Sequence, residues 1–297
     1  MNPSKPSLWF TLLVGVFLVP ILSWCSHLLY DALWWFDDAD QFFVDLFGLP
    51  DGEYASTSFF LIALLSHGLD LSSIFLLARF SGESLIQSLA LKPGRLSVFM
   101  MPALLAGTFM AAILAVVVNE QLFEDYGDLA EQMNESMGVA GQSNLVLLLL
   151  VAAVLPALGE ELFIRGYLQR RLLRRLPAWS AILLSSVLFA AAHGNVEHAL
   201  SVFPIGLWFG IVAYYSESVW PGVFCHFFFN ASLALLHSIS SSPGSMEAEG
   251  GPSGPGEVGP LGAFVAGSIL LCLLTLLTWF VKSRRRSDVP GGNPLPV

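Results

Sequence analysis

Residues 144–170 read NLVLLLLVAAVLPALGEELFIRGYLQR and decide the fold of this chain. No charged side chain occurs before Glu160, and the stretch is longer than the roughly 20 residues that a helix needs to cross a bilayer. Glu160, Glu161 and Arg165 nevertheless lie inside it. Ionisable groups are costly at that depth, so these three side chains predict either a function or a structural pairing.

The composition of the whole chain indicates the same class of protein. Of its 297 residues, 55% are hydrophobic and only 12% are charged, which is more apolar than one soluble core requires. We therefore predict an all-α, polytopic membrane helix bundle with eight transmembrane helices. The predicted spans are 8–30, 57–79, 97–119, 144–170, 178–195, 199–215, 219–239 and 261–281.

The formal charge of −10 is distributed unevenly between these spans. Acidic residues collect in segments 31–56, 120–143 and 240–260, none of which contains Lys or Arg. The basic residues lie in the alternate connections, for example at 170–175 and 282–286. Because Lys and Arg resist translocation, this alternation places both termini on the cytoplasmic side. Eight crossings satisfy the pattern, whereas seven or nine would break it.

The polar residues of 144–170 have a predictable arrangement on a helix. Residues four apart share a face, so we expect Glu161 to pair with Arg165. Glu160 then points about 100° away from that pair. One acid is neutralised, and the other is left available as a general base.

Two later spans bring polar groups to the same depth. Glu160 lies sixteen residues before Leu176 and His193 sixteen after Pro177, so an antiparallel hairpin places both about 10–15 Å below the cytoplasmic surface. His226 lies about 12 Å into its span from the same side. Asn230 follows one turn later on the same face. This convergence predicts a shared site.

These residues also form motifs that resemble those of a known family. The motifs are Glu160-Glu161-Leu-Phe-Ile-Arg165-Gly166, Phe189-Ala-Ala-Ala-His193 and His226-Phe-Phe-Phe-Asn230. In order and spacing they resemble the motifs of the CPBP intramembrane proteases, also called the ABI or Rce1-like CAAX-protease family. The resemblance covers about residues 145–235. It implies that Glu160 and His193 activate water, that His226 and Asn230 stabilise an oxyanion, and that Glu161 and Arg165 are supports.

The resemblance leaves the cofactor open. Glu160, His193 and His226 could supply three zinc ligands with an open position for water. A metal-independent glutamate mechanism has also been assigned to the family. We favour this second mechanism, because the three side chains come from separate helices without a pair of His one turn apart.

The domain organisation follows from the spans and the resemblance. Residues 1–143 are expected to form three transmembrane helices with acidic external loops, and 144–239 a CPBP-like catalytic core. Residues 240–260 are rich in Gly, Pro and Ser and predict a flexible external loop. Residues 261–297 are expected to form the last transmembrane helix and a basic cytoplasmic tail.

The resemblance implies an intramembrane endopeptidase that cuts near the C-terminus or the membrane anchor of a client protein. The expected partners are a membrane-anchored protein or peptide substrate and the lipid bilayer, and not nucleic acid. The short chain and the acidic external loops favour a bacterial inner (cell) membrane, with the active site toward the cytoplasm. They also favour a sorting-tail or peptide client over a prenylated CAAX protein.

A second function class is a non-catalytic membrane scaffold, or a proton or ion transporter that uses the buried polar cluster. A transporter is expected to contain inverted repeats, and the two halves show no convincing repeat. Two further polar groups receive structural interpretations. His67, near Asp70, is interpreted as a helix-packing hydrogen bond. Glu197 and His198 are interpreted as part of a solvated connection.

Overall fold

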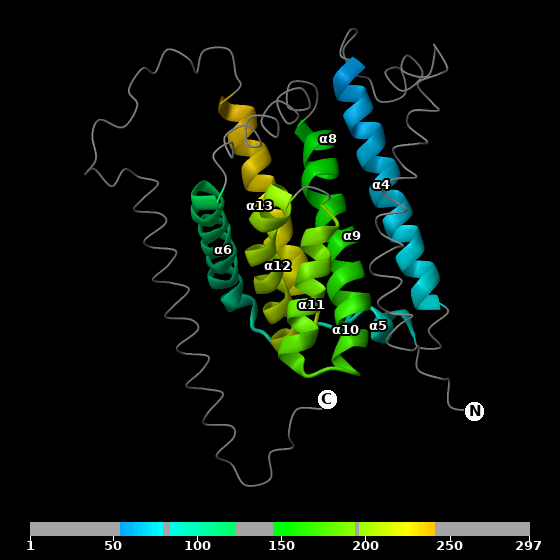
Figure 1. The fold of residues 1–297 in the computed structure, drawn as a ribbon. Coiled ribbons are helices and arrows are strands. Elements are labelled where there is room, and N and C mark those ends of the chain that lie inside the picture. Colours follow the sequence, from blue (N-terminus) through cyan, green and yellow to red (C-terminus); the bar gives the residue numbers. More distant parts are fainter. Residues whose placement is uncertain (1–53, 80–83, 123–144, 194–195, 241–297) are drawn as a thin grey trace.

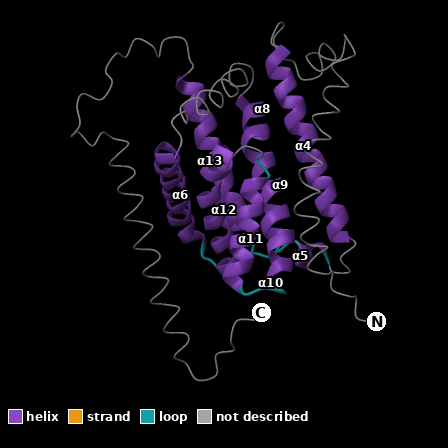
Figure 2. Ribbon diagram, in the orientation of Figure 1, coloured by secondary structure: helices purple, strands orange, loops and turns teal. Residues whose placement is uncertain are grey.

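The computed structural model describes residues 54–79, 84–122, 145–193 and 196–240 (Figure 1). All regular elements in these ranges are helical, and Figure 2 shows them joined by loops. In chain order they are α4 (Tyr54–Arg79), α5 (Leu85–Ser88), η2 (Val98–Met100), α6 (Met101–Leu122), α8 (Leu145–Leu149), η3 (Leu150–Val154), α9 (Leu155–Glu161), η4 (Leu162–Gln169), α10 (Arg170–Leu173), α11 (Ala178–Ala191), α12 (Val196–Ser216) and α13 (Trp220–Ser240).

The all-helical prediction is confirmed for these residues, and helices occur at the six predicted spans that fall within them. Predicted spans 8–30 and 261–281 lie outside the described residues, as do the basic tail and nearly all of the acidic loops. The eight-span count and the placement of the termini therefore stay predictions. Three described helical stretches are long and apolar enough to cross a membrane: Val98–Asn119, Leu145–Leu173 and Val196–Ser216.

One predicted boundary is wrong. The span 178–195 was expected to be helical through His193, but α11 ends at Ala191 and His193 lies in the turn that follows. The helix of 14 residues is about 21 Å long, shorter than the roughly 30 Å of a bilayer core. His193 is thus held at a helix end, where the chain reverses toward α12.

The stretch from α8 to α10 is one continuous helical run with two π-helical segments, η3 and η4. It contacts helices on several sides, because α4, α12 and α13 pack against parts of it and α11 packs on η4 (Figure 1). All residues of η4 are buried. Phe163 and Leu168 join Ile74 of α4 and Phe189 of α11 in the largest apolar core cluster of the described residues. Because side chains of η4 are enclosed all round, charged residues in it must find partners within the bundle.

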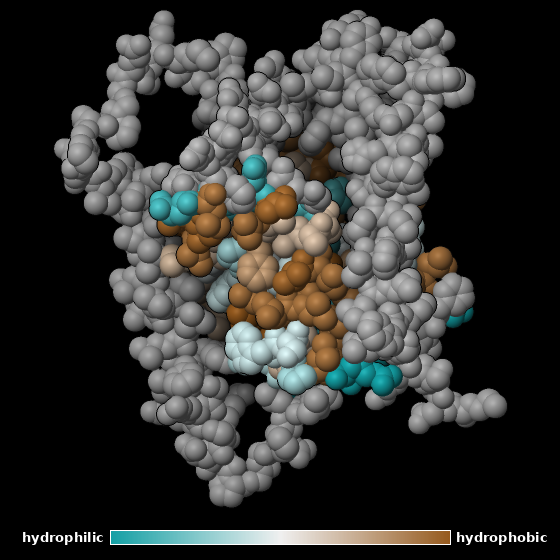
Figure 3. All heavy atoms as spheres, in the orientation of Figure 1, coloured by the Kyte–Doolittle hydropathy of each residue, from teal (hydrophilic) through white to brown (hydrophobic). Residues whose placement is uncertain are grey.

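One end of the bundle gathers the basic connections. The segment after α5 packs on the turn between α12 and α13: the Arg95 N–H donates to the Ser216 carbonyl at 2.9 Å, and the Ser218 hydroxyl donates to the Lys92 carbonyl at 2.8 Å. The arginine-rich end of α10 lies at the same end (Figure 1). Figure 3 shows a hydrophobic middle on the visible described face, with the most hydrophilic residues at its two ends. This pattern suits a bilayer around the middle of the helices.

Candidate active site

The centre of the candidate site is a buried ion pair. Arg165 donates from Nη1 to Glu161 Oε1 at 2.8 Å, and both side chains have no exposed surface. The predicted pairing of Glu161 with Arg165 is confirmed. Arg165 also donates from Nη2 to the Gly206 carbonyl of α12 at 2.8 Å. The guanidinium lies over the Phe189 ring, 4.5 Å from its centroid. Loss of either member of this buried pair would be strongly destabilising, because it would leave the other charge buried without its counterion.

Two glycines let neighbouring helices approach this pair. A Cβ added at Gly222 of α13 would lie 2.8 Å from Glu161 Oε2. A Cβ added at Gly206 of α12 would lie 2.6 Å from the Phe189 ring and 3.4 Å from Arg165 Nη2. Small residues allow close backbone approach between helices in a membrane. The pair is therefore enclosed from two sides by backbone.

A second polar contact with α12 lies one turn further along the same helical run, at Gln169. Gln169 donates from Nε2 to the Gly210 carbonyl at 2.8 Å and accepts from the Ser185 hydroxyl at 3.1 Å. The Arg165 and Gln169 side chains thus hold α12 at two successive turns. Interhelical hydrogen bonds of this kind fix the rotation of one helix against another. That rotation is what directs Glu161 inward.

Glu160 has a different environment from its neighbour. Its side chain is 26% exposed, and its Oε2 lies 4.0 Å from Nε2 of His226. That separation is longer than a hydrogen bond. The other ring nitrogen, His226 Nδ1, is 3.2 Å from Glu161 Oε1 and donates to it, because a carboxylate paired with Arg165 can only accept. His226 therefore turns one ring nitrogen toward each carboxylate but bonds only to Glu161. Phe209 stacks on its ring at 5.2 Å between centroids.

His193 reaches the site from the end of α11. Its Nδ1 lies 2.9 Å from the Phe189 carbonyl oxygen, so this nitrogen carries the proton and donates. In the neutral ring Nε2 is then an acceptor. The ring makes an edge contact with His198, with 4.7 Å between centroids. His198 is in turn within electrostatic range of Glu160.

Two histidines that the sequence did not assign to the site lie beside it. His198 was expected in a solvated connection, but it lies partly buried in the first turn of α12, against His193. His67 of α4 is within electrostatic range of Glu160 and His226. Its Nδ1 is 3.8 Å from the position of a Cβ built on Gly159. Three histidines, His67, His198 and His226, thus lie within electrostatic range of Glu160, and His193 contacts His198.

The structure brings most of the expected residues together. Glu160, Glu161, Arg165 and His226 are joined by the contacts above, and His193 approaches the group through His198. Asn230 lies one helical turn after His226 in α13 and is partly buried. The chemistry available is a partly exposed carboxylate with imidazole groups nearby and, one helical turn from His226, the amide of Asn230. This set can accept a proton from water and donate to a developing negative charge.

The suggested zinc ligands do not form a ready metal site. Among the described residues, no group of three or more His, Cys, Asp or Glu side chains is placed to hold a metal ion. Glu160, His193 and His226 are all within the described ranges. These three side chains therefore do not fit a zinc site in the described arrangement.

The comparisons with known proteins concern the part of the chain that contains this site. Residues 142–232 match the family described as "Type II CAAX prenyl endopeptidase Rce1-like". A Bacillus subtilis (strain 168) protein named "Putative membrane peptidase YdiL" is 21% identical over 132 residues, 44% of this chain. That match spans 54% of the relative, so the chain covers about half of its length. No solved structure is significantly similar to the chain.

Proposed function

We propose that the chain is an intramembrane endopeptidase that uses Glu160 as its base, since residues 142–232 match the family described as "Type II CAAX prenyl endopeptidase Rce1-like". One observation carries the proposal. Of two adjacent carboxylates, one is sealed in an ion pair, and the other is partly exposed with histidines around it. A purely structural role would require only the first.

In the proposed reaction, water attacks the carbonyl carbon of a client peptide bond. Glu160 takes the proton of the water and returns it to the amine nitrogen as the carbon–nitrogen bond breaks. His193 assists through Nε2, since its Nδ1 is occupied by the Phe189 carbonyl. A general base positioned in this way contributes about a hundredfold to ten-thousandfold in rate.

His226 and Asn230 are proposed to stabilise the oxyanion. The amide of Asn230 can donate in any state. His226 can donate from Nε2 only when the ring carries both protons, because Nδ1 already donates to Glu161. The Glu161–Arg165 pair then acts through His226, whose ring it orients. This makes Glu161 and Arg165 positioning residues and not catalytic ones.

The proposed client is a membrane-anchored protein or peptide, cut near its C-terminus or its anchor. The placement of Glu160 within a helix long and apolar enough to cross a membrane supports a substrate that is itself held at the bilayer. A bacterial cell membrane and a sorting-tail or peptide client remain our proposal from the sequence. The active site would open toward the cytoplasmic side, where the basic connections are predicted.

The proposal is tested by comparing membrane proteomes of cells that carry the native chain or Glu160→Gln. Proteins with unprocessed C-terminal peptides should accumulate only with the variant. Glu217→Gln is the matched control, because Glu217 is an exposed carboxylate paired with Arg95 at 3.0 Å, away from the Glu161–Arg165 pair. It should leave processing unchanged. Identical processing by the native chain and Glu160→Gln would refute the role of Glu160, and a scaffold would then be the better interpretation.

A further inference from the structure

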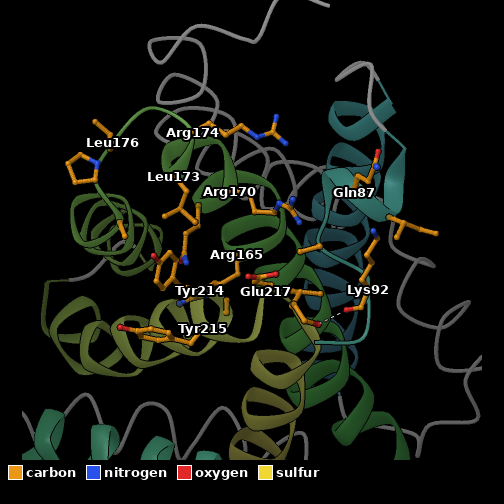
Figure 4. A pocket seen from close by; sticks show the side chains of 18 residues that line it. Gln87, Lys92, Arg165, Arg170, Leu173, Arg174, Leu176, Tyr214, Tyr215 and Glu217 are labelled. Carbon is orange, nitrogen blue, oxygen red and sulfur yellow. Dashed lines mark hydrogen bonds between the residues drawn. The ribbon is translucent and has the colours of Figure 1, made fainter. Parts of the chain in front are cut away.

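A cavity of about 500 Å³ lies at the basic end of the bundle, between α5, α10, the start of α11 and the end of α12 (Figure 4). Arg165 and Gln169 line it, whereas Glu160 and His226 do not. Carbonyl oxygens of α12 accept a hydrogen bond from each of the two lining side chains. The proposed base therefore lies outside this cavity, and the groups that face Glu160 come from other sides of its helix.

The Glu160 carboxylate is held by few contacts. Among the described residues it makes no hydrogen bond, and its Oε2 lies 4.0 Å from Nε2 of His226. A catalytic group must be held within about 0.5 Å of its working position by the side chains around it. Catalytic hydrogen bonds are often long in the free enzyme and shorten when substrate binds. A base at Glu160 is thus expected to have a second holding group besides His226.

The neighbouring helix α4 packs on the run that carries Glu160. It does so through one apolar stripe, formed by Leu64, Leu71, Ile74 and Ala78. His67 belongs to the same stripe, because all five residues fall within about 80° of one another around the helix. A polar side chain that interrupts an apolar stripe inside a membrane is costly, so His67 is a candidate for a functional role.

His67 lies beside α9 at the level of Glu160. Its Nδ1 is 3.8 Å from the position of a Cβ built on Gly159, the residue before Glu160. This is ordinary van der Waals distance, so the ring lies against the helix that carries the carboxylate. The ring is also within electrostatic range of both Glu160 and His226. Glu160 thus has one imidazole from α13 and a second from α4 in its surroundings.

We propose that His67 is a positioning residue that holds the Glu160 carboxylate through a ring N–H. An ionised carboxylate can only accept, so the imidazole must be the donor. The inference rests on the proposed role of Glu160 as the base. It extends the active site beyond residues 142–232, which match the family, to a helix from the preceding part of the chain.

Two variants of His67 separate a holding role from a packing role. His67→Leu continues the apolar stripe between Leu64 and Leu71, so the protein should fold, but the donor is lost. His67→Gln keeps an N–H donor near the position of Nε2. The removal of C-terminal peptides from clients, followed in membrane proteomes after pulse labelling, should slow at least about tenfold with His67→Leu. It should return to within about threefold of the native rate with His67→Gln.

The adjacent glycine provides the matched control for these variants. Gly68 is exposed on α4, and a Cβ built on it has nothing within 4 Å. Gly68→Ala should therefore leave the processing rate unchanged. If His67→Leu processes clients at the native rate, the holding role is overturned. If His67→Gln is as slow as His67→Leu, a hydrogen-bonding role is overturned, because the amide donor would not replace the imidazole.

A double-mutant cycle tests the contact without a client. The unfolding equilibrium constant of the purified full chain in mixed detergent micelles is measured for His67→Leu, for Glu160→Gln and for both together. The two effects should depart from additivity by at least about threefold, as they do for side chains in contact. The same cycle with Glu217→Gln is the control, because Glu217 is an exposed carboxylate paired with Arg95. That cycle should be additive.

The failures of the two proposals are distinguishable. Additive effects of His67→Leu and Glu160→Gln would overturn the contact between the two side chains, even if Glu160→Gln abolishes processing. Normal processing by Glu160→Gln would instead overturn the peptidase proposal, whatever the cycle gives. Non-additive effects together with slow processing by His67→Leu and recovery by His67→Gln would establish His67 as a positioning residue.

Discussion

Glu160 and Glu161 are neighbours in the chain, but they lie in two different regions of the molecule. Glu161 is fully buried, pairs with Arg165 and receives a bond from His226. Glu160, rotated by about 100° on the helix, is 26% exposed at its side chain and 4.0 Å from the nearest nitrogen of His226. The angle between adjacent residues on one helix therefore places Glu161 where it stabilises the bundle and Glu160 where it can react.

The largest effect on stability is expected at the buried Glu161–Arg165 pair. Arg165→Met would leave the Glu161 carboxylate buried without its partner, at a cost of about 3–5 kcal/mol. Thermal unfolding of the purified protein in detergent would measure the loss. Combining it with Glu161→Gln removes the stranded charge and should recover a large part of the stability. If the double variant is no more stable than Arg165→Met, the charge pairing is not what holds this region.

The second largest effect is expected at Glu160, and in activity alone. Glu160→Gln keeps the shape of the side chain but removes the base, so cleavage of a client should fall by at least about a hundredfold. The free energy of unfolding should change by less than about 1 kcal/mol, because the Glu160 side chain is partly exposed and lies 4.0 Å from His226, beyond hydrogen-bond distance. A cleavage assay and an unfolding curve on the same preparation would check both.

Glu161→Gln is the control for this prediction, since it makes the same oxygen-to-NH2 replacement in the adjacent carboxylate. It should lower both the activity and the unfolding temperature. Glu160→Gln and Glu161→Gln could instead lower activity equally, and only in proportion to their loss of stability. That result would remove the distinction between the two carboxylates. The scaffold interpretation would then account for the polar cluster.

The contrast also shows which features the sequence predicts. Long apolar runs locate the helices at the six predicted spans within the described residues, because burial in a membrane requires that composition. Glu161 and Arg165 are predicted to pair because their spacing of four is a local geometric rule. The end of α11 at Ala191 was missed, although Gly194 and Asn195 follow shortly afterwards and are residue types that commonly end helices.

Contacts between distant segments could not be predicted in the same way. His67 lies in α4, whose sequence is apolar on most positions and gives no indication of which face meets α9. His198 was placed in a loop because it follows a predicted helix end. Only the packing of α12 beside α11 brings it to His193. A polar residue inside an apolar span is the available signal, and His67 carried it.

A third prediction tests how closely backbone encloses the buried region. Gly222→Ala would place a Cβ 2.8 Å from Glu161 Oε2, so either the carboxylate or α13 must shift. Overpacking of this kind costs about 1–3 kcal/mol. The unfolding temperature should fall, and activity should fall with it through His226. The matched control is Gly68→Ala, because a Cβ on Gly68 in α4 has nothing within 4 Å. If Gly68→Ala is as harmful as Gly222→Ala, the effect is not specific to the ion pair.

The smallest effect on activity is expected at His198, which contacts the ring of His193. An edge-to-face ring contact contributes about 0.5–1.5 kcal/mol, so His198→Ala should reduce activity about two- to tenfold by letting the His193 ring move. His198→Phe keeps a ring at this position and should retain most of the activity if His198 acts by packing. If His198→Phe is as impaired as His198→Ala, the imidazole nitrogens of His198 are required. The reactive region would then extend beyond Glu160 and its motif residues, because a histidine outside the three motifs would take part in proton transfer.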